Sequence, residues 1–322
     1  MKKAECESQS ALVESLNFVC FAVKIFPRLE KLFAILHEDA GLLVVNKPAG
    51  LVCHPTKGDE FSSLISRARL HLKPSTLNLQ PSTHLINRLD RETSGVVIIA
   101  KNSETAGELG KIWETRAVQK EYLAIVHGRV RDDHGLIDAP LGRDGRSRVA
   151  IKDCVRPGGA PAQTEYWVEC RFNRPRPRPS SSNSDHRGRE RGRGREACSE
   201  FRLQAVQFST LNPQPSSCSL LRVIPRTGRK HQIRIHLAHL GHPIVGDKLY
   251  GGDEDLYLAL VENRLTDEQR ARLILPHHAL HARAVRFTWR GRPMEFSCAP
   301  EPWFNAFVAA DVSPLIRPWP KI

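Results

Sequence analysis

The sequence predicts a mixed α/β fold of the α+β class. The continuous run of apolar, mostly β-branched residues Val96–Ile99 is typical of a buried strand. Residues 122–126 alternate between two sets of side chains, which predicts a second strand with Tyr122, Ala124 and Val126 on one face. Residues 230–240 instead predict a helix that ends at Gly241 and has an apolar stripe of Ile233, Leu237 and Leu240.

The N-terminal third of the chain is predicted to combine strands with one helix. Residues 35–39 and 42–45 have the pattern of two strands around an acidic turn. A Pro-Gly turn then carries Lys47 at a fixed angle. Residues 61–72 are predicted to form a helix, and the Pro- and Ser-rich residues 73–83 a loop.

The middle of the chain continues with a helix and several strands. The Val96–Ile99 strand is followed by Ser103, which we expect to cap a helix over residues 104–113. A strand is predicted over residues 118–128, and residues 129–170 have the pattern of hairpins.

The C-terminal third is predicted to contribute one more helix and the closing strands. Residues 219–225 form a predicted strand before the 230–240 helix. Thr266 and Asp267 open a further helix. Residues 278–282, 285–287 and 294–296 are predicted to be the closing strands.

Composition limits the classes of function. The chain has 322 residues, 40% of them hydrophobic, and a formal net charge of +13, which favours a polyanionic partner such as nucleic acid. Phe18–Val23 is too short an apolar run for a secretory signal or a membrane span. The eight cysteines contain no C-x-x-C pair, so neither a disulfide framework nor a zinc ribbon is predicted, and we expect a cytoplasmic protein.

One domain is predicted over residues 33–312, between an N-terminal extension (1–32) and a C-terminal tail (313–322). Residues 174–196 interrupt it with eight arginines, three acidic residues and no apolar side chain. A segment of this composition cannot pack a core, so we expect a disordered insert between two strands. Phe201 is predicted to begin the strand that follows.

The loop before the Val96–Ile99 strand is the main candidate for chemistry. Arg88 and Arg91 flank Asp90, and neighbouring guanidinium groups keep a carboxylate ionised. An ionised, well-aimed carboxylate suits a nucleophile better than a proton donor. A lone Arg-x-Asp is more often a surface ion pair, so the interpretation depends on the sequence around it.

Arg88-Leu-Asp90-x-x-Thr-Ser-Gly95 resembles the catalytic loop of the RluA-type pseudouridine synthase family. Further motifs of that family follow the same order between residues 33 and 305. They are Lys47-Pro-x-Gly with His54-Pro55, Lys120-x-Tyr122-Leu-Ala, Thr227-Gly-Arg229-x-His231-Gln-Ile-Arg234, Gly241-His-Pro-Ile-x-Gly-Asp247, and His278-x-Leu-His281-Ala. This family often has an S4 RNA-binding module at the N-terminus, for which residues 1–32 are too few.

The resemblance implies a pseudouridine synthase catalytic fold: a central, largely antiparallel bent sheet flanked by helices, with a cleft along its middle. It also implies isomerisation of uridine to pseudouridine in structured ribosomal or transfer RNA, without metal or organic cofactor. No obligate protein partner is evident, and a monomer is expected. One departure is Asn87, where the family usually has His, which puts a proton relay at that position in doubt.

The resemblance also assigns roles to individual residues. Asp90 would be the catalytic carboxylate, Arg234 its basic partner and Tyr122 the aromatic side chain over the base. Arg88 would help to hold the strand open around the flipped-out base. The remaining candidates for RNA contact are Lys47, Arg229, Lys230 and His231.

Three alternatives remain. His236, His239 and His242 are spaced like metal ligands, but neither a nearby cysteine nor an H-E-x-x-H motif supports a metal site. A glycosidase would need a second carboxylate, and we expect Glu92 to face solvent. A non-catalytic RNA-binding protein would fit the Arg-rich insert but would not require Asp90.

Overall fold

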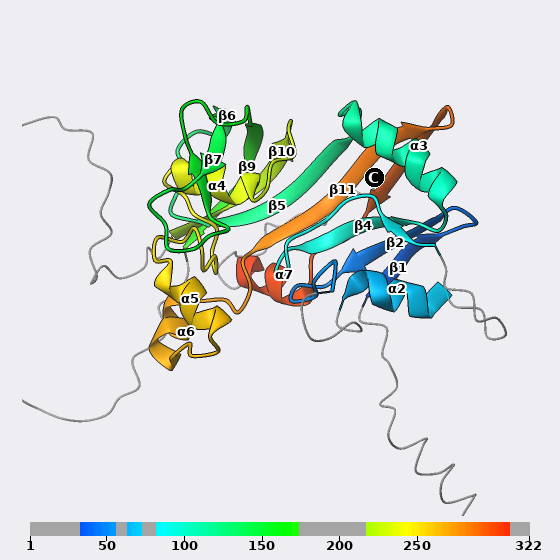
Figure 1. Cartoon of the computed structure of the whole chain (residues 1–322). Helices are drawn as coiled ribbons and strands as arrows, with labels where there is room; N and C mark the ends of the chain where they lie inside the picture. The colour runs from blue at the N-terminus through cyan, green and yellow to red at the C-terminus, as the bar shows by residue number, and fades with distance from the viewer. Residues whose placement is uncertain (1–32, 56–62, 73–81, 174–216, 310–322) are drawn as a thin grey trace, which may run out of the picture.

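The structure, a computed structural model, describes residues 33–55, 63–72, 82–173 and 217–309. Ten strands of this part of the chain form one sheet in the order β1-β2-β4-β11-β5-β10-β9-β6, with β12 beside β11 and β3 beside β4 (Figure 1). Strands β7 and β8 form a separate pair. The strands are β1 Ala34–Glu38, β2 Leu42–Lys47, β3 His84–Leu85, β4 Ser94–Ala100, β5 Gln119–His127, β6 His134–Asp138, β7 Leu141–Arg143, β8 Asp153–Val155, β9 Gln163–Asn173, β10 Ser217–Pro225, β11 Leu280–Trp289 and β12 Arg292–Ser297.

The pairing is antiparallel throughout the sheet except between β4 and β11, which run parallel. This confirms the predicted α+β class with a largely antiparallel sheet. The helices of the described residues are α2 Leu64–Leu72, α3 Ser103–Glu114, α4 Gln232–His239, α5 Asp255–Val261, α6 Asp267–Leu273 and α7 Pro302–Ala309.

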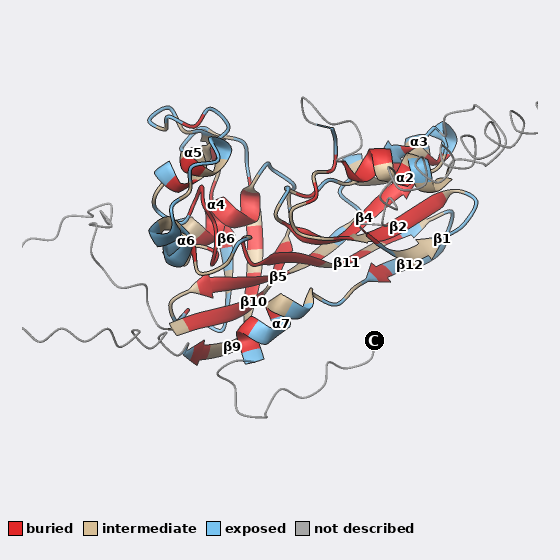
Figure 2. Ribbon diagram, turned by 90° about the horizontal axis from the view of Figure 1, so that it is seen from below, coloured by how far each residue is buried: buried red, intermediate tan, exposed pale blue. Residues whose placement is uncertain are grey.

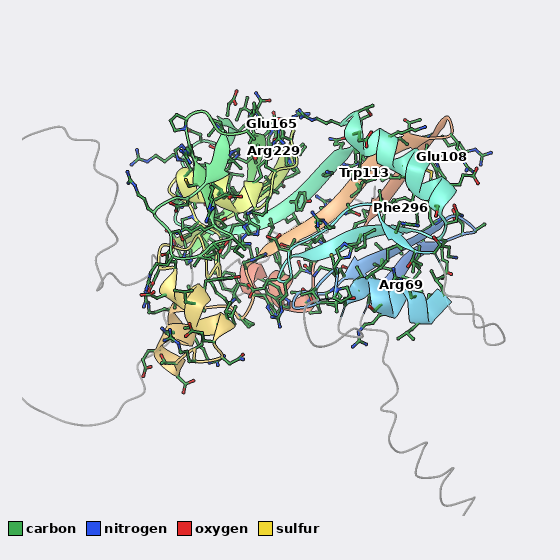
Figure 3. All side chains as sticks on the ribbon, in the orientation of Figure 1. Arg69, Glu108, Trp113, Glu165, Arg229 and Phe296 are labelled. Carbon is green, nitrogen blue, oxygen red and sulfur yellow. The ribbon has the colours of Figure 1, made fainter. Side chains whose placement is uncertain are left out.

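The half of the sheet formed by β1, β2 and β4 is covered on both faces. Val97 and Ile99 of β4 pack with α2, whereas Val96 and Ile98 pack with α3. This double burial explains why the strand has no polar alternation. In Figure 3, Trp113 of α3 and Phe296 of β12 lie in the second of these layers.

The half formed by β5, β10, β9 and β6 contains the largest core cluster, which includes Leu123, Ile125 and Leu221. In Figure 2 the central strands of this half and α4 are mostly buried. Helix α4 has six consecutive buried residues, Gln232–Leu237, so it is enclosed on several sides rather than amphipathic. The predicted stripe is wrong at Leu240, which is 37% exposed and follows the helix as its C-cap.

Most predicted elements are present, with local differences at their ends. Helix α3 is capped by Asn102, whose side chain accepts from the Thr105 amide, and not by Ser103. Helices α5 and α7 were not predicted. Residues 174–196 and the strand predicted at Phe201 lie outside the described residues.

None of the helices in the described ranges is long and apolar enough to cross a membrane. The cysteines in these ranges, Cys53, Cys154, Cys170, Cys218 and Cys298, are all free thiols.

Candidate active site

Asp90 lies on the loop between β3 and β4, and a buried lysine holds the base of that loop. Lys47 is fully buried at the end of β2. Its ammonium donates to the carbonyls of Pro48, Leu51 and Arg91 at 2.9, 2.7 and 3.0 Å, which uses all three of its donors. Burial lowers the pKa of Lys47 to about 8. Lys47 thus ties the Pro-Gly turn to the residue that follows Asp90.

Two more side chains fasten this loop through its backbone and that of β4. The Cys53 sulfur lies 3.4 Å from both the amide nitrogen and the carbonyl oxygen of Leu89. Asn87 accepts from the Ile98 amide at 2.8 Å and donates to the Val96 carbonyl at 3.0 Å. Asn87 therefore anchors the loop to β4, and both the oxygen and the nitrogen of its side-chain amide are hydrogen-bonded there.

The Thr-Ser-Gly sequence after Asp90 joins the loop to β11 and to the segment just before it. Thr93 is hydrogen-bonded to His278 at 2.7 Å, and Ser94 to His281 at 2.9 Å. Gly95 has φ +117°, and a Cβ there would lie 2.1 Å from the Ala282 carbonyl oxygen, so only glycine fits. This contact is the parallel seam between β4 and β11.

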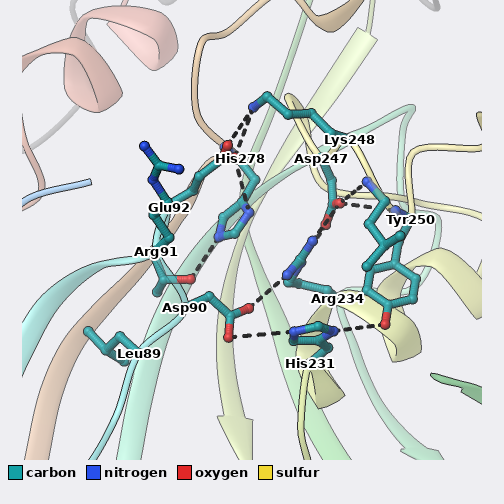
Figure 4. Close-up of polar contacts among 12 residues, drawn as sticks. Leu89, Asp90, Arg91, Glu92, His231, Arg234, Asp247, Lys248, Tyr250 and His278 are labelled. Carbon is teal, nitrogen blue, oxygen red and sulfur yellow. Dashed lines mark hydrogen bonds and ion pairs between the residues drawn. The ribbon is translucent and has the colours of Figure 1, made fainter. Parts of the chain in front are cut away.

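Arg234 of α4 supplies the counter-charge for Asp90 from the other half of the sheet (Figure 4). Its Nη1 donates to Asp90 Oδ2 at 2.8 Å. Its Nε and Nη2 donate to the two oxygens of Asp247 at 2.7 and 2.9 Å. Asp247 is buried and also accepts the amides of Leu249 and Tyr250. One guanidinium thus lies between a buried carboxylate and a carboxylate that reaches the cavity.

These contacts explain the ionisation of Asp90. Burial raises the pKa of this carboxyl, but the charge and the hydrogen bond of Arg234, with contributions from the nearby His231 and His278, outweigh it, so the pKa lies below its ordinary value. The dominant partner is Arg234, and the prediction that the flanking Arg88 and Arg91 hold the charge is wrong. Burial lowers the pKa of Arg234, but the charges and hydrogen bonds of Asp247 and Asp90 raise it by more, so the guanidinium stays charged.

His231 and Tyr250 lie beside this ion pair. His231 Nε2 is 3.9 Å from Asp90 Oδ1, and its Nδ1 is 2.9 Å from the Tyr250 hydroxyl. The Tyr250 hydroxyl also accepts the Asp153 amide at 3.3 Å. The Arg234 guanidinium lies 5.0 Å from the centre of the Tyr250 ring, which adds a cation–π contact.

A cavity of about 150 Å³ opens in front of Asp90. Tyr122 of β5 lines it, and burial together with the Asp90 charge raises the pKa of its hydroxyl. Basic side chains that line the same cavity are Arg88, Lys120, Arg229 and Arg234. The cavity therefore offers one carboxylate, one tyrosine and several cationic groups, which suits a polyanionic ligand with a planar base.

Glu92 does not face solvent, contrary to expectation. Its side chain is 14% exposed and forms an ion pair of 2.8 Å with Lys248. Glu92 also accepts the His278 amide at 3.1 Å. These contacts turn Glu92 away from the cavity, whose lining does not include it.

The structure places the other predicted site residues in different surroundings. Lys47 cannot contact RNA in this arrangement because its ammonium is buried and saturated by carbonyls, so that assignment is wrong. Lys230 lies at the surface in an ion pair of 2.9 Å with Asp153. Arg229 is exposed above the β9–β10 half, as Figure 3 shows, and its Nε donates to the Pro161 carbonyl.

The three histidines considered as metal ligands have other contacts or lie at the surface. His236 is bound to Thr164 and the Ala139 carbonyl, and His242 to the His127 carbonyl. His239 is exposed. Within the described ranges, no group of three or more His, Cys, Asp or Glu side chains could hold a metal ion.

Several residues that shape the site were not singled out from the sequence. They include Asp247, Lys248, Tyr250 and His278. Asp247 and His278 lie in motifs already noted for the resemblance, and Lys248 and Tyr250 directly follow the motif that ends at Asp247. Their buried polar side chains required long-range partners that local patterns do not identify. Their positions in these motifs, or directly after one of them, were the signal in the sequence that could have identified them as site residues.

Comparison with known proteins gives a consistent result. The family described as RNA pseudouridylate synthase matches residues 41–239. An uncharacterised RNA pseudouridine synthase of Aquifex aeolicus is 33% identical over 218 residues, which cover 67% of this chain and 55% of that protein. Ribosomal large subunit pseudouridine synthase D of Nitrosomonas europaea is 33% identical over 259 residues, which cover 79% of this chain and 57% of that protein.

The chain therefore spans little more than half the length of these two relatives. Among solved structures, human RNA pseudouridylate synthase domain containing 1 aligns with a TM-score of 0.58 at 22% identity. That alignment covers 89% of this chain and 90% of the human chain, and it supports the fold.

Proposed function

Because this chain belongs to the RNA pseudouridylate synthase family, we propose that it isomerises uridine to pseudouridine in RNA, with Asp90 as the catalytic carboxylate. The names of its relatives favour ribosomal RNA of the large subunit as the substrate. Transfer RNA is the second candidate. Tyr122 and Arg234 complete the proposed catalytic set.

The observation that carries the proposal is the pairing of Asp90 with Arg234 at the cavity. Arg234 donates to Asp90 Oδ2, whereas Oδ1 accepts no hydrogen bond from the residues that the structure describes and lies 3.9 Å from His231 Nε2. An ionised oxygen is thereby directed at the space in front of it. Such an oxygen can attack C1′ of the ribose or assist removal of the 2′ proton, and both routes lead to cleavage of the N1–C1′ bond.

The rest of the cavity fits a flipped-out uridine. A base inside structured RNA has to leave its stack before its sugar can reach Asp90. Arg88 and Arg229 lie at the cavity as candidates for the displaced backbone. The Tyr122 ring can stack on the uracil while its hydroxyl lies near C5, where a proton leaves after the new bond forms.

A hydrolase is disfavoured by the same geometry. Glycosidases that break a similar bond use two carboxyl groups across the substrate. Asp90 is the single carboxylate among the described residues that line the cavity. Glu92 is bound to Lys248, and Asp247 is bound to Arg234.

Asp90→Asn tests the proposal. The change is nearly isosteric, so we expect a folded protein that binds RNA and forms no measurable pseudouridine. Pseudouridine mapping of ribosomal and transfer RNA from cells carrying either form identifies the substrate. Glu262→Gln, an exposed carboxylate at the end of α5, is the control and should leave activity unchanged. Turnover of Asp90→Asn within about tenfold of the wild type would contradict the assignment.

A further inference from the structure

His231 and Tyr250 form a hydrogen-bonded pair whose open end is directed at Asp90. The imidazole lies between the Tyr250 hydroxyl, 2.9 Å from Nδ1, and Asp90 Oδ1, 3.9 Å from Nε2 (Figure 4). The His231 side chain is 11% exposed and lines the cavity. The imidazole is thus largely buried at the wall of the cavity, beside Asp90 Oδ1.

The backbone at His231 favours this placement. His231 is the N-cap of α4, but it has φ 54° and its side chain makes no capping bond. An N-cap side chain normally accepts from the first free amides of its helix. The left-handed conformation directs the imidazole into the cavity instead, and such conformations persist where the surrounding structure fixes them.

The hydrogen bonds also favour one of the two ring nitrogens as the site of the proton. The Tyr250 hydroxyl has one proton, and its oxygen already accepts the Asp153 amide at 3.3 Å. It can therefore donate to His231 Nδ1, which leaves Nδ1 as an acceptor and puts the proton of the neutral ring on Nε2. Burial lowers the pKa of His231, which favours this neutral form.

We propose that His231 is a further catalytic residue, whose Nε2–H donates a hydrogen bond to O2 of the target uracil, and that Tyr250 is the positioning residue that holds it in this tautomer. The inference rests on the proposed function. The gap of 3.9 Å between Nε2 and Asp90 Oδ1 places the donor beside the atoms that react with Asp90.

The chemistry explains why a neutral donor is useful here. On either route the electron pair of the N1–C1′ bond moves to the uracil, so O2 gains negative charge as the bond breaks. A fixed N–H directed at that oxygen stabilises the developing charge, and a neutral donor does so without transferring its proton. The uracil must remain nucleophilic at C5, and protonation would oppose this. Three of the five N–H groups of Arg234 already bond to the two carboxylates, which hold its guanidinium against Asp90 and Asp247.

The first experiment compares Tyr250→Phe with Tyr257→Phe. Phe at position 250 keeps the ring over Arg234 and removes the hydroxyl. Tyr257 packs on the same core cluster, so its variant is a matched control with an unchanged site. We expect Tyr250→Phe to lower kcat about tenfold, because only part of the His231 population then carries its proton on Nε2. The dissociation constant for RNA should stay within about twofold of the wild-type value. Tyr257→Phe should retain wild-type kcat.

The second experiment tests whether Tyr250 acts through His231. His231→Gln can place an amide N–H near the former Nε2 without help from the hydroxyl, so we expect it to retain about ten times the kcat of His231→Ala. In the His231→Gln background, Tyr250→Phe should change kcat less than twofold. A purely structural role of Tyr250 would instead give additive losses in this double-mutant cycle.

Nitrogen NMR of histidine-labelled protein provides a readout independent of turnover. We expect neutral His231 with the proton on Nε2 in the wild type, and both tautomers in Tyr250→Phe. A proton on Nδ1 in the wild type, or kcat of Tyr250→Phe within twofold of an active wild type, would overturn this inference alone. A wild-type protein that forms no pseudouridine in ribosomal or transfer RNA would overturn the proposed function, and this inference with it.

Discussion

The two sides of the cavity hold their functional groups by different means. On the β2–β4 side, Lys47, Cys53 and Asn87 all bond to backbone groups of the Asp90 loop or of β4. On the α4 side, Arg234 is held by a side chain, because both oxygens of Asp247 accept from it. The first side therefore fixes where the loop lies, and the second fixes where the charge lies.

This difference predicts different consequences of substitution. Backbone-directed bonds are independent of the charge on Asp90, so losing one loosens the loop while the electrostatics remain. A buried ion pair has no such independence, since removal of one partner leaves the other charge uncompensated out of water. Variants on the two sides should therefore separate the effect of the position of the Asp90 loop from the effect of the charge that faces Asp90.

The largest effect is expected from Asp247→Asn, which breaks the charge-holding side. The amide keeps the size of the side chain but removes the charge beside a buried guanidinium. We expect unfolding to become easier by about 4 kcal/mol, within the range for broken buried pairs. We also expect kcat to fall about a hundredfold because Arg234 is no longer fixed against Asp90, which corresponds to about 2.7 kcal/mol.

Urea unfolding and single-turnover kinetics measure these two quantities. Asp253→Asn is the control, since Asp253 forms a surface ion pair with Arg272 and should cost less than about 1 kcal/mol. Equal effects of the two substitutions would mean that Asp247 does not hold Arg234 in solution.

A smaller effect is expected from Lys47→Met, which breaks the loop-holding side. Met fills a similar volume but leaves three carbonyls without their donor, so we expect a loss of stability of about 3 kcal/mol. The rate should fall about tenfold because the Asp90 loop is less well placed. The affinity for RNA should change less than twofold, because the ammonium does not reach the surface.

Lys230→Met gives the opposite pattern and serves as the control. Lys230 is exposed, so its loss should leave stability nearly unchanged and weaken binding most at low salt. If Lys47→Met also reduces the salt dependence of RNA binding, Lys47 contacts RNA after all.

The sequence predicted those strands and helices whose hydrophobic pattern is set by neighbouring residues along the chain. The Val96–Ile99 run correctly predicted β4, because a short run of apolar, β-branched residues is typical of a strand that is buried on both faces. The stripe predicted for α4 was wrong at Leu240, which follows the helix and is exposed. Within the helix, buried polar side chains bond to Thr164, the Ala139 carbonyl and Asp247. Hydrophobic periodicity identified this helix but could not show which of its polar side chains are buried, because their partners are distant in the sequence.

The site was predictable to the extent that its motifs carry chemistry. Arg234 was expected to pair with Asp90, and the two are 2.8 Å apart, although their catalytic roles stay predictions. The sequence could not assign Lys47, because a lysine before a Pro-Gly turn has the same pattern whether its ammonium is exposed or buried. Glu92 was misjudged for a related reason: its partner Lys248 is 156 positions away.

The smallest effect concerns the seam that joins the two sides, where Thr93 and Ser94 bond to buried histidines. Burial lowers the pKa of both His278 and His281 to about 4, against an ordinary value near 6.5 in the unfolded chain. Between pH 6.5 and 4 the unfolded state therefore binds more protons than the folded state, and stability falls as the pH falls through this window.

Each of these histidines should contribute a slope of about 1.4 kcal/mol per pH unit within the window. His281→Asn retains a polar atom near Ser94 but cannot titrate. We expect this variant to be less stable than the wild type at pH 7. Between pH 6.5 and 5, however, its free energy of unfolding should fall less steeply, and the slope should be smaller by about the contribution of one histidine. Urea unfolding across this range measures the slope, with the exposed His239→Asn as the control. Because carboxylates stay ionised above pH 5, an unchanged slope in His281→Asn would mean that the seam opens to water before the protein unfolds, and that the two sides of the cavity separate first.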